Sequence, residues 1–417
     1  MKVLIVGGGG REHAIAYKLA QNSRIEELYC APGNGGIAKV AQCVDISATD
    51  IPGMVAFCKE KGIDFVVVAP DDPLALGMVD ALEAEGIRAF GPNKRAAQIE
   101  ASKSFSKELM KKYHIPTADY EVFDDYESAR TYLETSKLPI VLKADGLALG
   151  KGVLICETRQ QAMDGLKQIM LDKSFGDAGN RVVVEEYIEG PEVSILTFCD
   201  GKTIVPMKSA QDHKRAYDGD QGLNTGGMGT FAPSPKYTRE IQQEVEEKII
   251  KATLDALNSE GITFKGVIFF GLMLTKEGPK VLEYNARFGD PETQSVLMLL
   301  KSDLLDIFEA VVDERLEELD IQWEEDKSAV CVVMASGGYP ESYPKGLPIT
   351  GLDEVSGAVV FHAGTKQQDG QILTNGGRVL GVTAVGKDIP QAREIAYSNV
   401  AKIEFDGAHF RRDIGIK

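Results

Sequence analysis

Over the first hundred residues, short apolar runs alternate with longer amphipathic stretches. Helical patterns such as His13–Gln21 lie between the runs. The runs that read as strands are Val3–Val6, Leu28–Ala31, Phe65–Ala69 and Ala89–Gly91. This alternation is typical of a parallel sheet with helices on its faces. The pattern therefore predicts an α/β domain over residues 1–100.

A second compact unit follows a predicted helix over residues 96–113, which Pro116 brings to an end. Its predicted elements are strands Ile140–Lys143, Gly152–Cys156 and Arg181–Glu185 and helix Arg159–Met170. A glycine-rich loop separates the first two strands. We expect these elements to form a subdomain over residues 122–186.

The rest of the chain is predicted to combine hairpins, helices and one long loop. Asp200-Gly201 and Asn375-Gly376 are hairpin signals. Residues 216–234 are rich in glycine and lack periodicity, which predicts a loop of functional importance. The acidic, helical run Asp313–Asp326 marks a boundary before a β-rich end. The predicted units are 1–100; 101–121 with 187–325; 122–186; and 326–417.

Composition narrows the class of protein. The 417 residues carry a net charge of −17, which disfavours general binding to nucleic acid or an anionic membrane but allows a local phosphate pocket. None of the six cysteines forms a C-x-x-C pair, so we expect reduced thiols and no zinc site. The longest apolar stretch, Gly266–Leu274, is too short to span a bilayer. We expect a cytoplasmic protein.

Two glycine-rich segments resemble nucleotide motifs but fail their tests. Gly7–Gly10 sits where a dinucleotide fold binds phosphate, yet Glu12 replaces the third glycine and no acid ends the second strand, which excludes NAD. A plain tight turn and a phosphate site for another ligand both remain open. Gly150-Lys151-Gly152 lacks the following Ser or Thr and the helix of a P-loop. Since Lys143 lies inside an apolar strand, we interpret this loop as a phosphate-binding flap rather than an ordinary hairpin.

Three further segments carry polar side chains suited to ATP and metal. The strand ending at Glu185 can offer backbone groups to an adenine edge, and a later carboxylate can accept ribose hydroxyls; a simple hinge is the alternative. Glu283, Asn285 and Arg287 share one face of a strand. Two oxygen ligands suit Mg²⁺, and the arginine suits a carboxylate or phosphate; a solvated strand face is the alternative. Asp212 opens the long loop as a candidate substrate segment.

These segments together resemble the ATP-grasp superfamily, and more closely its glycinamide ribonucleotide synthetase family. The resemblance covers essentially the whole chain. Its motifs are GGGGREHA at Gly7–Ala14, KADGLALGKGV at Lys143–Val153, EGPEVS at Glu189–Ser194, QDHKRAYDGDQGLNTGGMG at Gln211–Gly229 and EYNARFGDPE at Glu283–Glu292. It implies an α/β chain, α+β overall, with a pre-ATP-grasp domain, a two-lobed ATP-grasp fold with a flap, and a β-rich C-terminal domain.

The resemblance also implies roles for individual residues. The implied catalytic residues are Arg287, Asp212 and Lys143. The implied ATP ligands are Lys103, Lys143, Lys151, Gly152, Glu185, Glu186, Tyr187, Ile188 and Glu192. The implied metal ligands are Glu283 and Asn285. The implied substrate ligands are Gly9, Arg11, Glu12, Asp212, His213, Lys214, Arg215, Arg287 and Asp290. Asp71 stands where the family pattern has Glu, so its role is left open.

The implied reaction joins glycine to 5-phosphoribosylamine at the expense of ATP, through glycyl phosphate, with Mg²⁺ or Mn²⁺ as cofactor. The implied partners are these small molecules, with neither nucleic acid nor membrane, and we expect a monomer or a weak dimer. Two alternatives are another ATP-grasp ligase, such as a carboxylating purine enzyme, and a catalytically idle nucleotide-binding protein. The first should lack Asp212-His213-Lys214-Arg215, and the second should lack a metal ligand or a phosphate lysine.

Overall fold

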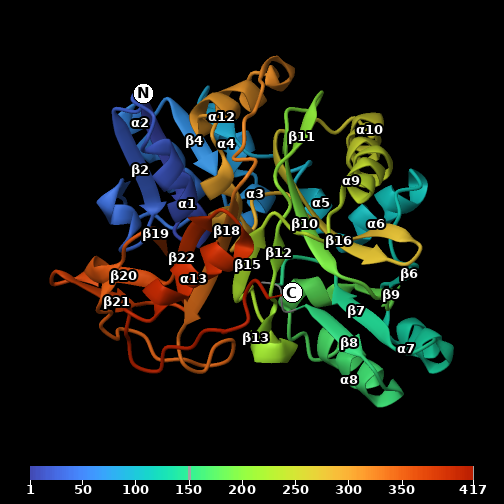
Figure 1. Ribbon diagram of the computed structural model, residues 1–417. Coiled ribbons are helices and arrows are strands. Elements are labelled where there is room, and N and C mark those ends of the chain that lie inside the picture. Colours follow the sequence, from blue (N-terminus) through green and yellow to red (C-terminus); the bar gives the residue numbers. More distant parts are fainter. Residues whose placement is uncertain (149–151, 417) are drawn as a thin grey trace.

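The computed structural model describes residues 1–148 and 152–416. Lys151, one of the predicted ATP ligands, lies outside the described residues. The N-terminal and C-terminal parts of the chain lie on one side of the molecule, and its middle forms the other side (Figure 1). A lobe that carries α7 and α8 projects from that second side (Figure 1).

The N-terminal sheet is parallel, with the strand order β3-β2-β1-β4-β5. Its strands are β1 (Lys2–Gly7), β2 (Glu27–Pro32), β3 (Gln42–Cys43), β4 (Phe65–Val68) and β5 (Arg88–Phe90). Its helices are α1 (Gly10–Leu19), α2 (Ile51–Lys61), α3 (Asp71–Leu76) and α4 (Met78–Ala84). Strand β4 is buried along its whole length, as expected where both faces of a parallel sheet are covered. The predicted parallel sheet is confirmed.

The predicted helix over residues 96–113 is wrong in one respect, because two helices replace it. They are α5 (Gln98–Ala101) and α6 (Lys103–Lys112). Ser102 between them is extended, and its hydroxyl accepts a hydrogen bond from the backbone N–H of Phe105. The carboxylate of Asp145 accepts the N–H of Ser104 at 3.1 Å. These acceptors satisfy the first turn of α6 and make the break favourable.

The central sheet is antiparallel, with the order β11-β10-β16-β17. Its strands are β10 (Glu192–Cys199), β11 (Ile204–Pro206), β16 (Gly266–Thr275) and β17 (Gly278–Asn285). The helices of this part are α9 (Arg239–Val245), α10 (Ala252–Ser259), α11 (Glu292–Val296) and α12 (Leu304–Val312), with a π-helical segment, Glu246–Lys251, between α9 and α10. The hairpin predicted at Asp200-Gly201 is confirmed, since it joins β10 to β11.

The lid sheet, named for the predicted subdomain over 122–186, is antiparallel in the order β6-β9-β7-β8. Its strands are β6 (Tyr120–Phe123), β7 (Ile140–Ala144), β8 (Val153–Cys156) and β9 (Val182–Glu186). Its helices are α7 (Tyr126–Thr135) and α8 (Arg159–Met170). The lid sheet and these helices enclose a hydrophobic core separate from the other cores of the described chain.

The C-terminal sheet combines strands from two distant parts of the chain, in the order β12-β15-β18-β22-β19. Its strands are β12 (Gln211–Asp212), β15 (Gly229–Ala232), β18 (Ser328–Ala335), β19 (Ala358–His362) and β22 (Arg378–Gly386), and α13 (Ile389–Val400) packs on it. Strands β12 and β15 precede the boundary predicted at residue 326. The predicted domain bounds therefore remain a prediction, and the sheet crosses one of them.

Two other sequence expectations for this half of the chain are wrong. Residues 216–234 are not one unstructured loop, because they include β15 and part of a hairpin of β13 (Arg215–Tyr217) and β14 (Gln221–Asn224). The acidic run 313–326 forms only a short 3-10 turn, Leu316–Glu318. In the first segment, the many glycines make the strands hard to recognise from the sequence. In the second, the acidic composition suggests a helix that does not form.

The second hairpin signal is also misplaced. Strands β20 (Thr365–Gln368) and β21 (Gln371–Thr374) pair around Asp369-Gly370, not around Asn375-Gly376. Asp369 and Gly370 have φ values of 50° and 77°, which a tight two-residue hairpin turn requires. Asn375-Gly376 instead leads from β21 to β22, and β22 pairs with β18 and β19. Both dipeptides fit a turn, and only the pairing of the strands distinguishes them.

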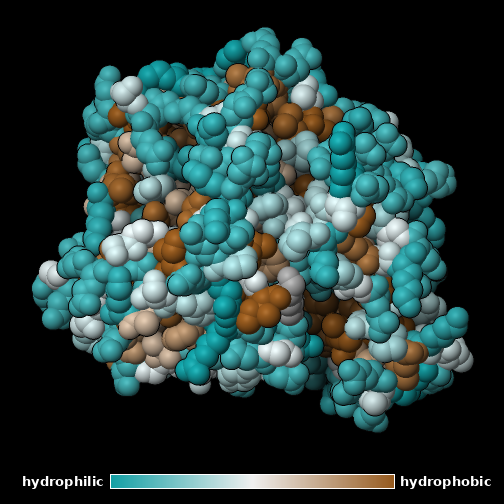
Figure 2. Space-filling view, in the orientation of Figure 1, coloured by the Kyte–Doolittle hydropathy of each residue, from teal (hydrophilic) through white to brown (hydrophobic). Residues whose placement is uncertain are grey.

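The N-terminal and central sheets share hydrophobic cores. One core joins β1 and β4 to β10 and β16, and a second joins other residues of β1 and β4 to β10, β16 and α12. On the face drawn in Figure 2, hydrophobic residues form small patches among hydrophilic ones, and the surface is hollowed beside the projecting lobe. Among the described residues, no helix is long and apolar enough to cross a membrane.

Candidate functional site

The end of β17 presents a line of polar side chains. Glu283 and Asn285 lie two positions apart on the strand, and Arg287 follows it. The amide oxygen of Asn285 accepts a hydrogen bond from Nη2 of Arg287 at 3.1 Å. The register between β16 and β17 shifts at Gly271 and Leu272, which makes Leu282 the extra residue of a bulge. This bulge turns the carbonyl of Leu282 towards the lid sheet.

Lysines from two elements, β7 and α6, approach this end of β17. Nζ of Lys143, on β7, donates to the carbonyl of Leu282 at 3.0 Å and lies 3.0 Å from Oε2 of Glu185. Nζ of Lys103, on α6, donates to the carbonyl of Gly146 at 2.7 Å. Burial lowers the pKa of Lys103, although Glu283 opposes that effect. The lid sheet, α6 and β17 therefore meet in a cluster of positive charge next to an acidic strand end.

Glu185 is shared by two buried lysines. Its Oε2 lies 3.1 Å from Nζ of Lys107 as well as 3.0 Å from Lys143. Burial lowers the pKa of Lys107 to about 8, with Glu185 opposing the shift. Oε1 of Glu185 is buried and has no hydrogen-bond partner among the described residues. A buried unpaired oxygen is unfavourable, so this atom is free to accept a hydrogen bond from a ligand.

The residues at β17 fit a hard divalent cation. Burial alone would raise the pKa of Glu283, but Lys214, Lys143, Lys103 and Arg287 outweigh it, and the pKa is lowered. Glu283 is therefore a carboxylate, and Asn285 adds a neutral oxygen. The described residues hold no group of three His, Cys, Asp or Glu side chains that could bind a metal. Such a small donor set suits Mg²⁺, which takes one or two protein ligands and completes its shell with phosphates and water.

The loop after β12 contributes charges to the same place. Nζ of Lys214 lies 3.3 Å from Glu192 and 3.9 Å from Glu283. Burial, and then the nearby Glu292, raise the pKa of Asp212 well above its usual range. The structure thus brings together four of the predicted residues, Asp212, Lys214, Glu192 and Glu283, although they come from β12, the following loop, β10 and β17.

The segment after β9 links the lid sheet to β10. Glu186 ends β9, and its carboxylate accepts the backbone N–H of Asp119 at 3.3 Å. Tyr187 is 37% exposed, and Ile188 lies in the connection that leads to Glu192 at the start of β10. The segment is therefore an accessible edge, with backbone groups of the connection outside any sheet ladder. An adenine ring could pair with such an edge.

A second cluster surrounds the N-terminus of α1. The carboxylate of Glu12 accepts the N–H of Gly9 at 2.6 Å and Nε of Arg11 at 2.6 Å. Nη1 of Arg11 donates to the carbonyl of Phe288 at 3.1 Å, and the N–H of Arg11 points to Asp290 at 3.4 Å. Carboxylates thus take up the donors that a phosphate would use. This arrangement favours the plain turn, with a polar ligand held by side chains, over a phosphate on the helix end.

Four other residues are singled out in the sequence: His213, Arg215, Gly152 and Asp71. His213 is buried, and its Nδ1 lies 3.1 Å from the carbonyl of Gly229. Arg215 lies in the β13–β14 hairpin, where Nη1 donates to the carbonyl of Gly222 at 2.8 Å. Gly152 is buried and immediately precedes β8, next to residues 149–151, which lie outside the described residues. Asp71 begins α3 and interacts electrostatically with Arg11 and Glu100.

Sequence reasoning missed several charged residues of the site. Lys107 lies four positions after Lys103, on the same face of α6, which was the one signal available. Glu100 is bound to Arg287 at 2.9 Å. Burial raises the pKa of Glu100 to about 7, while Arg287 opposes the shift. Arg378, from the C-terminal sheet, donates to the carbonyls of Gly226 and Asp290, both at 2.7 Å.

A parallel sheet, a central sheet with a separate lid and a charged site between them define the ATP-grasp class of proteins. Three family descriptions match consecutive parts of the chain: the phosphoribosylglycinamide synthetase N domain at residues 1–100, its ATP-grasp (A) domain at 101–293 and its C domain at 329–417. The chain belongs to the phosphoribosylglycinamide synthetase family.

Curated relatives agree with this assignment. A phosphoribosylamine–glycine ligase from Caldanaerobacter subterraneus is 51% identical over 414 residues, which cover 99% of each chain. The trifunctional purine biosynthetic protein adenosine-3 from Gallus gallus is 49% identical over all of this chain and 42% of its own length. The similarity to single-function relatives extends from end to end.

Solved structures agree as well. The crystal structure of phosphoribosylamine–glycine ligase from Thermotoga maritima matches with a TM-score of 0.84 and 34% identity, covering 99% of this chain and 100% of that one. A biotin carboxylase domain from Hydrogenobacter thermophilus, solved with MgADP and bicarbonate, matches with a TM-score of 0.76 and 17% identity, covering 98% and 91%. The second likeness shows the fold alone.

Proposed function

We propose that the chain joins glycine to 5-phosphoribosylamine, with conversion of ATP to ADP and phosphate, as a step of purine biosynthesis. The full-length relatives named phosphoribosylamine–glycine ligase support this reaction. The observation that carries it is the end of β17, where Glu283, Asn285 and Arg287 meet lysines of α6 and the lid sheet. An oxygen-rich donor set among cations is what phosphoryl transfer requires.

In the proposed mechanism, glycine carboxylate attacks the γ-phosphorus of ATP, the bond from that phosphorus to the β–γ bridging oxygen breaks, and glycyl phosphate forms as ADP leaves. The amine of phosphoribosylamine then attacks the acyl carbon, and phosphate leaves. Lys103, Lys143 and Arg287 are placed to offset the charge on the phosphoryl group in transfer. No covalent bond to the chain is needed, so the residues act by binding and orienting the reactants.

Glu283 and Asn285 are the residues that would hold the metal ion. A bound Mg²⁺ would neutralise charge on the phosphates of ATP. The low pKa of Glu283 keeps the carboxylate ready for this role at neutral pH. Mn²⁺ prefers similar oxygen ligands, so the proposal covers either ion.

The remaining roles follow from position. Glu185, Glu186, Tyr187 and Ile188 border the edge proposed for adenine, and Glu192 is placed for the ribose. The cluster proposed for phosphoribosylamine consists of Gly9, Arg11, Glu12 and Asp290. Asp212 and Lys214 are proposed as substrate ligands, and Lys214 interacts electrostatically with Glu283. Family resemblance alone supports the proposed ligand roles of four further residues, Lys151, Gly152, His213 and Arg215. We also propose a cytoplasmic protein, monomeric or weakly dimeric.

A substrate-omission assay tests the function. ADP release is measured with ATP, Mg²⁺, glycine and phosphoribosylamine, and each of the last two is withheld in turn. We expect full ADP release only with both, and none when bicarbonate replaces glycine. Release with bicarbonate would support a carboxylating enzyme instead. Absence of release under every condition would support an idle nucleotide-binding protein, although Lys103, Lys143, Glu283 and Asn285 are all present.

A further inference from the structure

Glu100 lies directly against Arg287, although 187 positions separate them in the chain. Oε1 of Glu100 is 2.9 Å from Nη2 of Arg287, and the side chain of Glu100 is 8% exposed. Oε2 of Glu100 accepts the backbone N–H of Ala286 at 2.8 Å. One carboxylate on α5 therefore holds both the guanidinium and the backbone that leads to it. Neither the mechanism above nor the family resemblance uses Glu100.

The other contacts of Arg287 show how its guanidinium is held and which of its donors has no partner. Nη2 also donates to the amide oxygen of Asn285 at 3.1 Å, and Nη1 donates to the carbonyl of Phe288 at 3.2 Å. Of the five N–H donors of the guanidinium, two are used in these hydrogen bonds, and Nη2 is also ion-paired with Glu100. Nε–H is buried and has no hydrogen-bond partner among the described residues. Since a buried unpaired donor is unfavourable, Nε–H of Arg287 points to a missing acceptor.

We propose that Glu100 is a positioning residue for the ligation. It fixes the guanidinium so that Nε–H of Arg287, the buried donor without a partner among the described residues, is held for an oxyanion, either the glycine carboxylate or the phosphoryl group in transfer. Through the shared Nη2 it also orients the amide oxygen of Asn285 towards the metal. The proposal rests on the proposed function and adds the residue that fixes the geometry of Arg287.

The pair of contacts made by Glu100 supports this role over a simple brace between α5 and β17. A brace needs one bond, to the backbone of Ala286. The second oxygen of Glu100 instead forms an ion pair with the side chain of Arg287. Without Glu100, the guanidinium would be attracted towards Glu283 or Glu292, the acids with which it also interacts electrostatically. A fixed guanidinium loses less conformational entropy when it binds an oxyanion, and this preorganisation favours the transition state.

The test compares Glu100→Gln, Arg287→Lys and the double variant with the unchanged chain. Steady-state kinetics with glycine varied gives kcat and KM, and nucleotide binding is measured separately with ADP. Glu108→Gln, the same change at an exposed position of α6, is the matched control. Glu100→Asp, which keeps the charge but withdraws it by one methylene, serves as a second variant in case Glu100→Gln fails to fold.

We expect Glu100→Gln to lower kcat/KM for glycine by about 10–100-fold, as is typical when a supporting residue is lost, with ADP affinity within twofold. A rise in KM would assign the oxyanion to glycine, and a fall in kcat alone would assign it to the phosphoryl group. The double variant should be no worse than Arg287→Lys alone, because both changes disturb one guanidinium.

Two outcomes overturn the inference while the proposed function stands. One is glycine-dependent ADP release by Glu100→Gln equal to that of the Glu108→Gln control. The other is a double variant whose loss is the product of the two single losses. If the unchanged chain itself releases no ADP with glycine and phosphoribosylamine, the proposed function is wrong, and the inference falls with it.

Discussion

At the scale of single residues, Glu283 is a carboxylate whose pKa is set by opposing effects of burial and of nearby cations. It interacts electrostatically with Lys214, Lys143 and Lys103, and these charges, with that of Arg287, outweigh the effect of burial on its pKa. The lysines need a counter-charge when no nucleotide is bound, and the nucleotide needs the lysines and a cation when it is bound. A carboxylate that binds a metal can meet both needs. Its removal should therefore affect the metal and the chemistry more than the fold.

Glu283→Ala should lower kcat by on the order of 10²–10³-fold, the usual loss when one electrostatic contact to a transition state is removed. The Mg²⁺ concentration for half-maximal ADP release should rise at the same time. Glu277→Ala, an exposed change in the turn before the same strand, should leave both values unchanged. Both are measured by ADP release as Mg²⁺ is titrated. Unchanged Mg²⁺ dependence in Glu283→Ala would remove Glu283 from the metal site.

Some residues of the site could be grouped from the sequence, and others could not. Glu283, Asn285 and Arg287 could be grouped from sequence because they alternate along one strand, so their proximity is local. Glu100 could not, since its partner Arg287 is reached only after two sheets have packed. Lys107 was missed for the same reason, because its partner Glu185 belongs to β9. Long-range ion pairs leave no mark in the local pattern.

At the scale of elements, α6 depends on the break at Ser102. The hydroxyl of Ser102 caps the helix and lies 3.2 Å from the carboxylate of Asp145 in the lid segment. Lys103 is the first residue of the helix, so the cap also fixes where its side chain begins. The periodicity of residues 96–113 predicted helix correctly but not the break, which needs an acceptor from a distant loop. The misplaced hairpin at Asn375-Gly376 has a similar origin, since β22 pairs with other strands.

Ser102→Ala should destabilise the chain by about 1 kcal/mol, the typical cost of a lost N-cap. It should also raise the KM for ATP several-fold, because the first turn of α6 carries Lys103. Thr158→Ala removes the corresponding cap of α8, whose hydroxyl accepts the N–H of Gln161. This control should show the loss of stability without the change in KM. Thermal unfolding and ATP-dependent kinetics measure the two effects, and an equal KM in both variants would contradict the argument.

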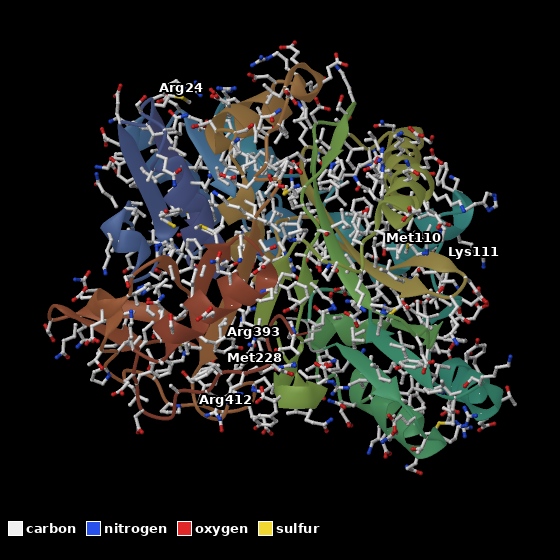
Figure 3. All side chains as sticks on the ribbon, viewed as in Figure 1. Arg24, Met110, Lys111, Met228, Arg393 and Arg412 are labelled. Atoms are coloured by element: carbon white, nitrogen blue, oxygen red, sulfur yellow. The ribbon has the colours of Figure 1, made fainter. Side chains whose placement is uncertain are left out.

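At the scale of the whole molecule, side chains join parts that are far apart in sequence. Arg24, labelled in Figure 3, binds Glu309 of α12 at 2.8 Å and also pairs with Asp306. Within α1, Nδ1 of His13 accepts the backbone N–H of His362 at 2.7 Å. The N-terminal domain is thereby joined to α12 and to the C-terminal sheet. The contact of His13, which follows Glu12 in α1, helps to hold the N-terminal cluster in place.

The contact between His13 and His362 predicts how stability depends on pH. Burial, the neighbouring His362 and Lys39 lower the pKa of His13 to about 3, and burial and Lys39 lower that of His362 to about 4. Both rings are therefore neutral in the folded chain at pH values where an unfolded histidine, with a pKa near 6.5, takes up a proton. Because the unfolded state binds more protons below pH 6.5, stability is complete above that pH and falls as the pH drops towards 4.

Each buried histidine should contribute up to about 1.4 kcal/mol per pH unit to this fall. His362→Gln keeps a polar side chain beside Thr365, with which Nδ1 of His362 is in contact at 3.0 Å, but cannot take up a proton. Its stability should therefore fall less steeply than that of the unchanged chain between pH 6.5 and pH 5. Urea unfolding, followed by the fluorescence of Trp323, the single tryptophan, gives the free energy at each pH. His114→Asn at an exposed position should keep the original slope, and equal slopes in all three chains would show that His362 is not held neutral by the fold.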